Sequence, residues 1–340
     1  MADSAFNMEM PYDQVVELVA EALRRAGCSP STSLILAKNC VGAEIAGSES
    51  HGLFRLEGYL ATLRSGWVDG MAQPKVSILS PAHIHVDAAN GFAQTALAAA
   101  RDALIARTRA CGIAILTIGG SHHLAALWPD VAPFAEEGLI AISMVNSFAC
   151  AIPVGAKSAI LGTNPLAFAA PVPDGAPFVF DFATTSMSNG DVRVAAREGR
   201  RLQPGCGVDR HGSPTTDPNE ILDGGALLPF GGHKGSAISL MIELLVAGLT
   251  GGKFSSEVDW SQHPGAATPH TGQVIIAIDP SVDGAGDWNS RCSQFIEMLR
   301  HAGMDTYPGL RRWRSRKGES VRVTADVARL LSLASQGAHD

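Results

Sequence analysis

The sequence predicts an α/β protein with a helical unit at its N-terminus. Residues 13–27 (DQVVELVAEALRRAG) place apolar side chains at the spacing of one helix face. From residue 76 onward, short apolar runs typical of strands alternate with helical stretches and turns. Strands and helices that alternate in this way are expected to share one compact unit.

The predicted elements follow from periodicity and from turn residues. The first helix is expected to have Asp13 as its N-cap and to end at Gly27, while an alanine-rich helix is expected to end at Gly112. In chain order, we expect helices over 13–27 and 31–47, a hairpin over 76–80 and 83–91, a helix over 91–112, strands over 113–119, 139–147 and 177–184 with a helix over 127–138 among them, a further strand of the same sheet over 272–279, and a helix over 290–303.

Composition limits the class of protein. A chain of 340 residues buries roughly three quarters of its unfolded surface, which is enough for two domains. The net charge of -7 argues against nucleic acid or an anionic membrane as the main partner. The six cysteines contain no CxxC pair, so we expect neither a zinc site nor a disulfide framework. We expect a cytoplasmic protein, because no signal peptide or membrane span is visible and Glu243 interrupts the longest apolar run.

Nucleotide-binding motifs of the common kinds are missing. No GxGxxG follows a predicted strand, and GGHKGS lacks the spacing of a phosphate-binding P-loop. A bound nucleotide would therefore require another architecture. Residues 203–225, rich in Gly, Pro, Asp and Thr, are predicted to form a long surface excursion, and loops of this length tend to be functional.

The segment GSESHGLFRLEGYL (47–60) places His51 beside Ser50 and four residues before Arg55. If LFRLEGYL is helical, His51 lies at its N-terminus, and Arg55 and Tyr59 share one face. Histidine transfers protons near neutral pH, and an arginine holds a carboxylate by two hydrogen bonds. The pair therefore suits reduction at a carbon beside a carboxylate. The alternative is a capping Ser-His pair with a solvated arginine.

Other polar residues lie at the ends of predicted strands. The pair His122 and His123 stands where a strand passes into a helix, a position that favours contact with phosphate or ribose. A metal is disfavoured, because adjacent histidines ligate one ion poorly. Thr163 begins a loop before a buried strand, and Asp181 and Asp191 could orient a histidine or bind ribose hydroxyls. Ordinary turn chemistry is the alternative for these three residues.

Two basic segments complete the candidates. In FGGHKGS the glycines permit close backbone approach, so that His233 and Lys234 can face phosphate or carboxylate. The helix that follows (237–249) is apolar enough to be expected in the core. YPGLRRWRSRKG (307–318) carries five basic residues, which predict either a clamp for the 2'-phosphate of NADP or a solvated basic face.

Six segments in the same order resemble the type-2 malate/L-lactate dehydrogenase family: SHGLFRLEGYL, HHLAALWPDVAPFAEEGLIAISMVNS, GTNPLAFAAP, FDFATTS, LPFGGHKGSAISLMIELLVAGLTGG and YPGLRR. The resemblance implies a non-Rossmann α/β fold, in which a helical domain from both chain ends flanks a mixed-sheet cofactor-binding domain. It places the helical, substrate and dimerisation domain in 1–75 and 225–340, with strand 272–279 joining the sheet, and the NADPH-binding domain in 76–224. A homodimer is implied.

The resemblance also implies a reaction. Many members have tyrosine at the position of His233; with AAREGR (195–200) and DWSQHPGAATPHTGQ (259–273), this departure resembles the branch that reduces Δ1-piperideine-2-carboxylate and Δ1-pyrroline-2-carboxylate to L-pipecolate and L-proline with NADPH. The alternatives are an NAD(P)-dependent 2-keto acid or 2-hydroxy acid dehydrogenase of the malate, lactate or ureidoglycolate type, and a catalytically silent binding protein that keeps the fold.

Residue roles carry over from the matching motifs. The resemblance implies that Ser50 and Asp191 are relay residues, that His51 is the proton donor, and that Arg55 and Thr163 bind substrate. Residues implied at the cofactor are His123, Leu124, Ala125, Ala126, Leu127, Asp181, Phe182, Ala183, His233, Lys234, Gly309, Leu310, Arg311 and Arg312. No metal site is implied.

Overall fold

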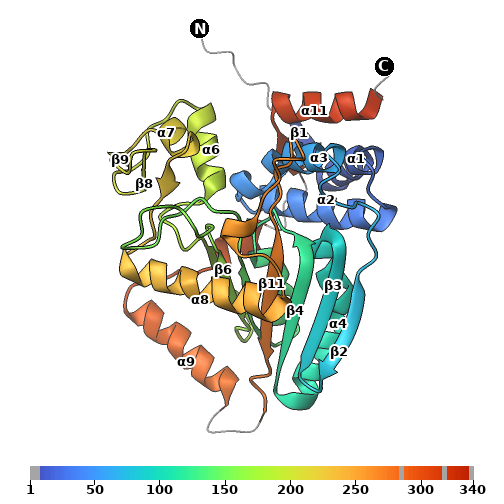
Figure 1. Ribbon diagram of the computed structural model, residues 1–340. Coiled ribbons are helices and arrows are strands. Elements are labelled where there is room, and N and C mark those ends of the chain that lie inside the picture. The colour runs from blue at the N-terminus through green and yellow to red at the C-terminus, as the bar shows by residue number, and fades with distance from the viewer. Residues whose placement is uncertain (1–7, 283–286, 316–319, 337–340) are drawn as a thin grey trace.

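A mixed seven-stranded sheet forms the centre of the computed structural model, which describes residues 8–282, 287–315 and 320–336 (Figure 1). The strand order is β2-β3-β4-β11-β5-β6-β7. Neighbours pair antiparallel except β3 and β4, which are parallel. The strands are β2 (Lys75–Ser80), β3 (His83–Phe92), β4 (Ile113–His122), β5 (Ile140–Val145), β6 (Leu166–Ala170), β7 (Phe178–Phe182) and β11 (His270–Ile278).

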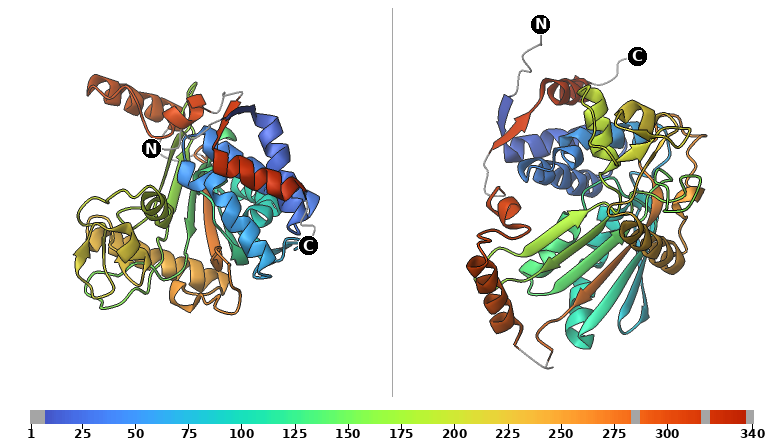
Figure 2. Two further views of the ribbon diagram at one scale, coloured as in Figure 1. Left: turned by 90° about the horizontal axis from the view of Figure 1, so that it is seen from above. Right: turned by 90° about the vertical axis from the view of Figure 1, so that its left-hand side faces the viewer.

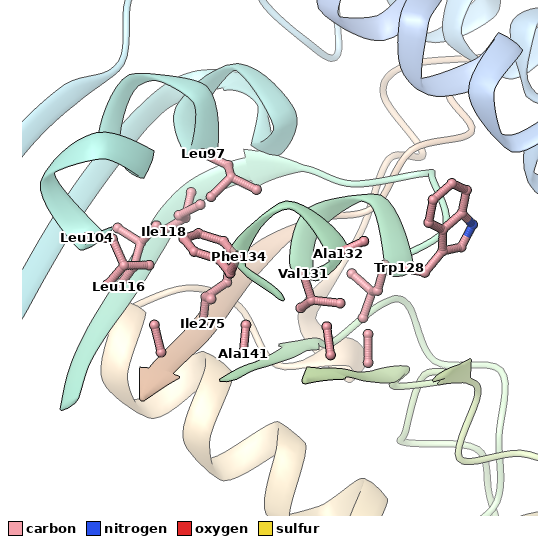
Figure 3. Close-up of a cluster of buried hydrophobic side chains, with 14 of the residues drawn as sticks. Leu97, Leu104, Leu116, Ile118, Trp128, Val131, Ala132, Phe134, Ala141 and Ile275 are labelled. Carbon is pink, nitrogen blue, oxygen red and sulfur yellow. The ribbon is translucent and has the colours of Figure 1, made fainter. Parts of the chain in front are cut away.

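Helices cover both faces of this sheet. On one face, α4 (Ala93–Cys111) and α5 (Trp128–Glu136) enclose the largest apolar cluster, which Figure 3 shows around Leu116, Phe134 and Ile275. On the other face, Ile242 and Val246 of α8 (His233–Thr250) pack against Val274. Because side chains alternate along a strand, Val274 and Ile275 point to opposite helix layers.

The helix α8 is less buried than its composition predicts. Leu240, Met241 and Leu244 are 44%, 42% and 68% exposed, so the expectation that the segment 237–249 lies in the core is wrong for this stripe. A helix on the outer face of a sheet buries only the side that meets the strands. The exposed stripe is therefore an apolar surface on the outside of the molecule.

A helical unit stands over one end of the sheet and joins the two ends of the chain. Strands β1 (Met8–Pro11) and β12 (Ser320–Val323) pair antiparallel. Val15 and Leu23 of the first helix share a core with Val321 and Leu331 near the end of the chain. The helices of this unit are α1 (Tyr12–Arg25), α2 (Pro30–Ile45), α3 (Leu56–Arg64) and α11 (Ala325–Gln336).

A third, smaller unit lies beside the helical unit over the same end of the sheet (Figure 2). Its core contains Val192, Cys206 and Ile221, which explains why the predicted excursion over 203–225 is folded rather than a plain surface loop. The unit consists of α6 (Asn189–Arg197), α7 (Pro218–Leu222) and the strands β8 (Gly207–Val208), β9 (Pro214–Thr215) and β10 (Ala226–Leu227).

Most predicted elements are confirmed, including the hairpin and the strand at 272–279, which joins the sheet. The helix over 91–112 is confirmed and ends at Gly112 in the left-handed conformation, with φ of 79°. Asp13 is not the N-cap, because α1 begins at Tyr12 after Pro11; its carboxylate lies in the first turn instead.

The C-terminal region divides between the units. Although residues 225–340 are predicted to belong with the helical domain, α8 packs on the sheet, and Trp288 of α9 (Trp288–His301) donates a hydrogen bond to the carbonyl of Pro171 at the end of β6. The boundaries between domains remain a prediction. In the part of the chain that the structure describes, no helix is long and apolar enough to cross a membrane.

Candidate active site

A cavity of about 800 Å³ opens where the three units meet. The helical unit supplies Ser50, His51 and Arg55, and the small unit supplies Asp191. Loops at the end of the sheet supply Thr163 and residues 123–127, and the end of β7 supplies Asp181 and Phe182. The predicted site residues that line the cavity are Ser50, His51, Arg55, His123, Leu124, Ala125, Ala126, Leu127, Thr163, Asp181, Phe182, Ala183, Asp191 and Arg312.

Five predicted residues do not line this cavity. His233 and Lys234 are exposed at the start of α8. Gly309 packs against the backbone of residues 177–179, and Leu310 and Arg311 follow in the short helix α10 (Leu310–Ser315). Arg316 and Lys317 of the basic segment lie outside the described residues.

His51 lies in a 3-10 turn, η1 (Glu49–His51), and a second such turn, η2 (Leu53–Arg55), precedes α3. The helix therefore begins at Leu56, later than LFRLEGYL suggests. Nδ1 of His51 shares a hydrogen bond of 2.9 Å with Oγ of Ser50. Burial, followed by the positive charge of Arg55, lowers the pKa of His51 to about 3. The imidazole is thus neutral near pH 7.

Arg55 is a cation prepared for an anionic ligand. Its Nε is buried and has no hydrogen-bond partner among the described residues. Burial lowers its pKa to about 10, which still leaves it charged at neutral pH. Gly190 packs directly on the guanidinium, since a Cβ there would lie 2.6 Å from Nη2. Gly190 could not be identified from the sequence, because its contact with Arg55 arises only in the fold.

Asp191 lies on the cavity wall near the start of α6. Its Oδ2 accepts a hydrogen bond of 2.8 Å from Ser188 Oγ, and the same hydroxyl accepts from the backbone nitrogen of Asp191 at 3.0 Å. Ser188 is the N-cap of the helix, so the carboxylate is held in place. Among the described residues, no hydrogen bond joins Asp191 directly to His51, and the relay role of Asp191 remains a prediction.

The far side of the cavity combines anionic and cationic groups. Oδ2 of Asp181 accepts hydrogen bonds from the backbone nitrogens of Leu127 at 2.7 Å and Trp128 at 3.1 Å. Burial raises the pKa of Asp181, and these two hydrogen bonds oppose the rise. The guanidinium of Arg312 lies 5.6 Å from the centre of the Trp128 ring. Arg312 also lines the cavity, so this wall offers a cation to a phosphate-bearing ligand.

The loop that carries Thr163 is held under strain. Asn164 has a positive φ of 37°, which is unfavourable for a residue other than glycine. Its Nδ2 donates to Oε1 of the buried Glu243 at 2.9 Å. Oε2 of Glu243 accepts from Asn146 Nδ2 at 3.2 Å and from the backbone nitrogen of Ser255 at 3.1 Å. One carboxylate thus fixes three loops beside the cavity, a role that its place in an apolar run could have suggested.

Among the described residues, the contacts of the cavity do not meet the requirements of a metal site. Across the described ranges, no group of three or more His, Cys, Asp or Glu side chains gathers in a way that could hold an ion.

Comparison with known proteins places this chain in a family. A family model described as malate/L-lactate dehydrogenase matches residues 10–330. A Δ1-pyrroline-2-carboxylate/Δ1-piperideine-2-carboxylate reductase from Pseudomonas syringae pv. tomato is 54% identical over 327 residues, covering 95% of each chain. A reductase of the same name from Pseudomonas putida is 53% identical over 320 residues, covering 93% of this chain and 94% of the other.

Solved structures agree. The crystal structure of Δ1-piperideine-2-carboxylate reductase from Pseudomonas syringae pv. tomato matches with a TM-score of 0.93, covering 96% of this chain and 99% of that chain. The chain belongs to the malate/L-lactate dehydrogenase family, and the fold class expected from the resemblance is confirmed. It is accordingly an oxidoreductase, and its family implies a nicotinamide cofactor.

The Glu243 network gives a first prediction. In Glu243→Gln, one carboxylate oxygen becomes an amide nitrogen that faces hydrogen-bond donors, so a buried donor loses its partner. We expect the free energy of unfolding in urea to fall by about 1–3 kcal/mol. Ser239→Ala is the control, because this buried hydroxyl on the same helix has no partner in the described residues, and we expect no loss. Equal stability of Glu243→Gln and wild type would contradict the prediction.

The acid stability of the protein gives a second prediction. His122 is fully buried between Thr268 and Asn90, and burial, followed by the charge of His270, lowers its pKa from 6.5 to about 3. Below pH 6.5, His122 becomes protonated in the unfolded chain, whereas in the folded chain it stays neutral until the pH approaches 3. Stability is therefore lost as pH falls from 6.5 toward 3, by up to about 1.4 kcal/mol per pH unit for each such imidazole. His122→Gln should flatten this slope in unfolding measured from pH 7 to 5, and parallel slopes would contradict the assignment.

Proposed function

We propose that the protein is an NADPH-dependent reductase of cyclic imine carboxylates. It converts Δ1-piperideine-2-carboxylate to L-pipecolate and Δ1-pyrroline-2-carboxylate to L-proline. The observation that carries the proposal is the position of Arg55, a cation with a buried unpartnered donor, in one cavity with the Ser50–His51 pair. The names of relatives that are 54% and 53% identical over nearly the whole chain support this substrate class.

The chemistry of the residues follows from their charges. Arg55 binds the substrate carboxylate through its guanidinium, with Thr163 on the neighbouring wall. Burial is the main cause of the low pKa of His51, and the charge of Arg55 adds to it; a bound carboxylate offsets that charge, so the pKa of His51 rises and proton transfer becomes easier. His51 then gives the proton to the ring nitrogen of the substrate. Ser50 and Asp191 orient the imidazole of His51 and return a proton to it. When bound, the nicotinamide cofactor supplies the hydride for the imine carbon.

The residues that would hold the cofactor lie along the rest of the cavity. His123 to Leu127 and Asp181 to Ala183 form its wall, and Arg312 provides the cation that suits a phosphate. We assign the preference for NADPH over NADH to Arg312 together with the adjacent segment from Gly309 to Arg311. A guanidinium recognises a 2'-phosphate by charge-assisted hydrogen bonds, which NADH cannot accept.

The proposed reaction is tested by substrate and by substitution. We expect NADPH oxidation with Δ1-piperideine-2-carboxylate to exceed that with pyruvate or oxaloacetate at one enzyme concentration. His51→Ala removes the proton donor and should lower kcat by about 10²- to 10⁴-fold, whereas His301→Ala, a side chain 79% exposed, should leave kcat unchanged. Wild-type turnover in His51→Ala would refute the assignment.

Substitution of Arg55 separates binding from chemistry. Arg55→Ala should raise the KM for the imine by about 10- to 100-fold, because a charge-assisted pair is lost. Arg55→Lys keeps the positive charge but loses the planar guanidinium that can bind a carboxylate by two hydrogen bonds. An intermediate KM is therefore expected. If wild type and both Arg55 variants preferred a keto acid to the imine, the result would favour a 2-keto acid dehydrogenase instead.

The family resemblance and the surface of α8 support a homodimer. Leu240, Met241 and Leu244 form an exposed apolar stripe, and His233 and Lys234 are exposed at the start of the same helix. We assign this helix to the interface between two copies. In that arrangement His233 and Lys234 contact the cofactor in the partner's cavity, which accounts for their position outside their own.

The interface is tested by charge. Leu244→Glu places a carboxylate in the stripe and should shift the protein from dimer to monomer in sedimentation equilibrium. Met71→Glu, at a residue 58% exposed on another part of the surface, should leave the dimer intact. A monomeric wild type, or a dimer unaffected by Leu244→Glu, would exclude this interface.

A further inference from the structure

A chain of buried polar side chains connects the cavity wall to the interior of the sheet. His123 Nε2 lies 3.0 Å from Oδ2 of Asp130, and the side chains of both are 4% exposed. Gln273 Nε2 donates to the same oxygen at 2.7 Å and to Ser143 Oγ at 3.0 Å. The chain thus links the residue that follows β4 with α5, β11 and β5.

The surroundings of this chain are apolar. Asp130 precedes Val131 on α5, Ser143 follows Ala141 on β5, and Gln273 precedes Ile275 on β11; in each case the apolar neighbour belongs to the cluster of Figure 3. Taking polar groups out of water into such a layer costs free energy, which hydrogen bonds recover only in part. If these positions served only to pack the interior, apolar residues would fill them equally well. The arrangement therefore points to a role at the end that meets the cavity.

The geometry fixes which nitrogen of His123 carries a proton. The carboxylate of Asp130 can only accept a hydrogen bond, so Nε2 of the neutral imidazole must be the donor. Nδ1 then carries no hydrogen and can only accept a hydrogen bond. Nδ1 has no hydrogen-bond partner among residues 8–282, 287–315 and 320–336, and His123 lines the cavity. A ligand in the cavity therefore meets a fixed acceptor.

The chemistry of the cofactor identifies the matching donor. His123 and His51 line the same cavity, so both imidazoles face the space in which the reaction is proposed to occur. The nicotinamide ring must occupy that space for hydride transfer. The carboxamide N–H₂ is the hydrogen-bond donor that this ring carries.

We propose that Asp130 is a positioning residue that, through His123, presents a hydrogen-bond acceptor to the carboxamide N–H₂ of the nicotinamide. The inference rests on the proposed function, because it takes a nicotinamide cofactor as the ligand. Asp130 does not touch the cofactor; it sets the tautomer and orientation of the imidazole that does. The bond would fix the face of the ring that is turned toward the imine.

Binding measured by isothermal titration calorimetry tests the proposal without turnover. The two ligands are NADPH and its reduced 3-acetylpyridine analogue, in which a methyl group replaces the amide nitrogen. Wild type should bind NADPH about tenfold more tightly, because the analogue cannot donate to Nδ1. Asp130→Asn keeps the volume but permits either tautomer of His123, and the preference should fall below about threefold.

Two further variants make the test specific. His123→Ala removes the acceptor, so its preference for NADPH should disappear. Asp279→Asn is the matched control, because it also neutralises a buried carboxylate, which pairs with Arg109 and does not line the cavity. Its preference should stay at the wild-type value, and thermal unfolding of each variant confirms that it is folded.

The outcomes are distinct. Equal binding of both ligands by wild type overturns the inference and leaves the reductase proposal standing if imine reduction is observed. An unchanged preference in Asp130→Asn or His123→Ala, or an equal loss in Asp279→Asn, also overturns it. If wild type binds neither ligand, both the inference and the proposed cofactor are wrong.

Discussion

The antiparallel pairing of β11 with β4 on one side and β5 on the other holds the structure together. β11 is the last strand of the large sheet in the sequence, yet it occupies the fourth place of seven. Its pairing with β4 and with β5 joins the half of the sheet that contains β2, β3 and β4 to the half that contains β5, β6 and β7. Without β11 the sheet would be two separate pieces. Every residue of the cavity that follows β4 or β5 therefore depends on this central strand.

The same strand order concentrates polar chemistry at one end of the sheet. β4 ends at His122, just before His123, and β5 ends at Val145, just before Asn146. β11 begins between them and contributes Gln273 below the surface. Helices above supply Arg55 and Asp191, so that opposite charges face the cavity from different units. The site is consequently a product of assembly, because Arg55 and Asp191 come from different units.

Local patterns were sufficient for much of this molecule. The helix before Gly112, the hairpin, and the grouping of Ser50, His51 and Arg55 follow from short segments whose periodicity or motif is complete in the sequence. Long-range features were not accessible in the same way. Gln273 and Asp130 are 143 residues apart, and Glu243 meets Asn164 across 79 residues. The exposure of α8 was mispredicted because composition reports how apolar a helix is and not how many of its sides are covered.

The ladder between β1 and β12 has a consequence for biosynthesis. The helices near the start of the chain leave the ribosome long before Val321 and Leu331, which complete their core. Until Val321 and Leu331 are made, the apolar sides of these helices lack their final covering, whereas β2 to β4 and β5 to β7 emerge in order and each group can collapse before β11 joins them. Truncation from the C-terminus would therefore damage the first helices made.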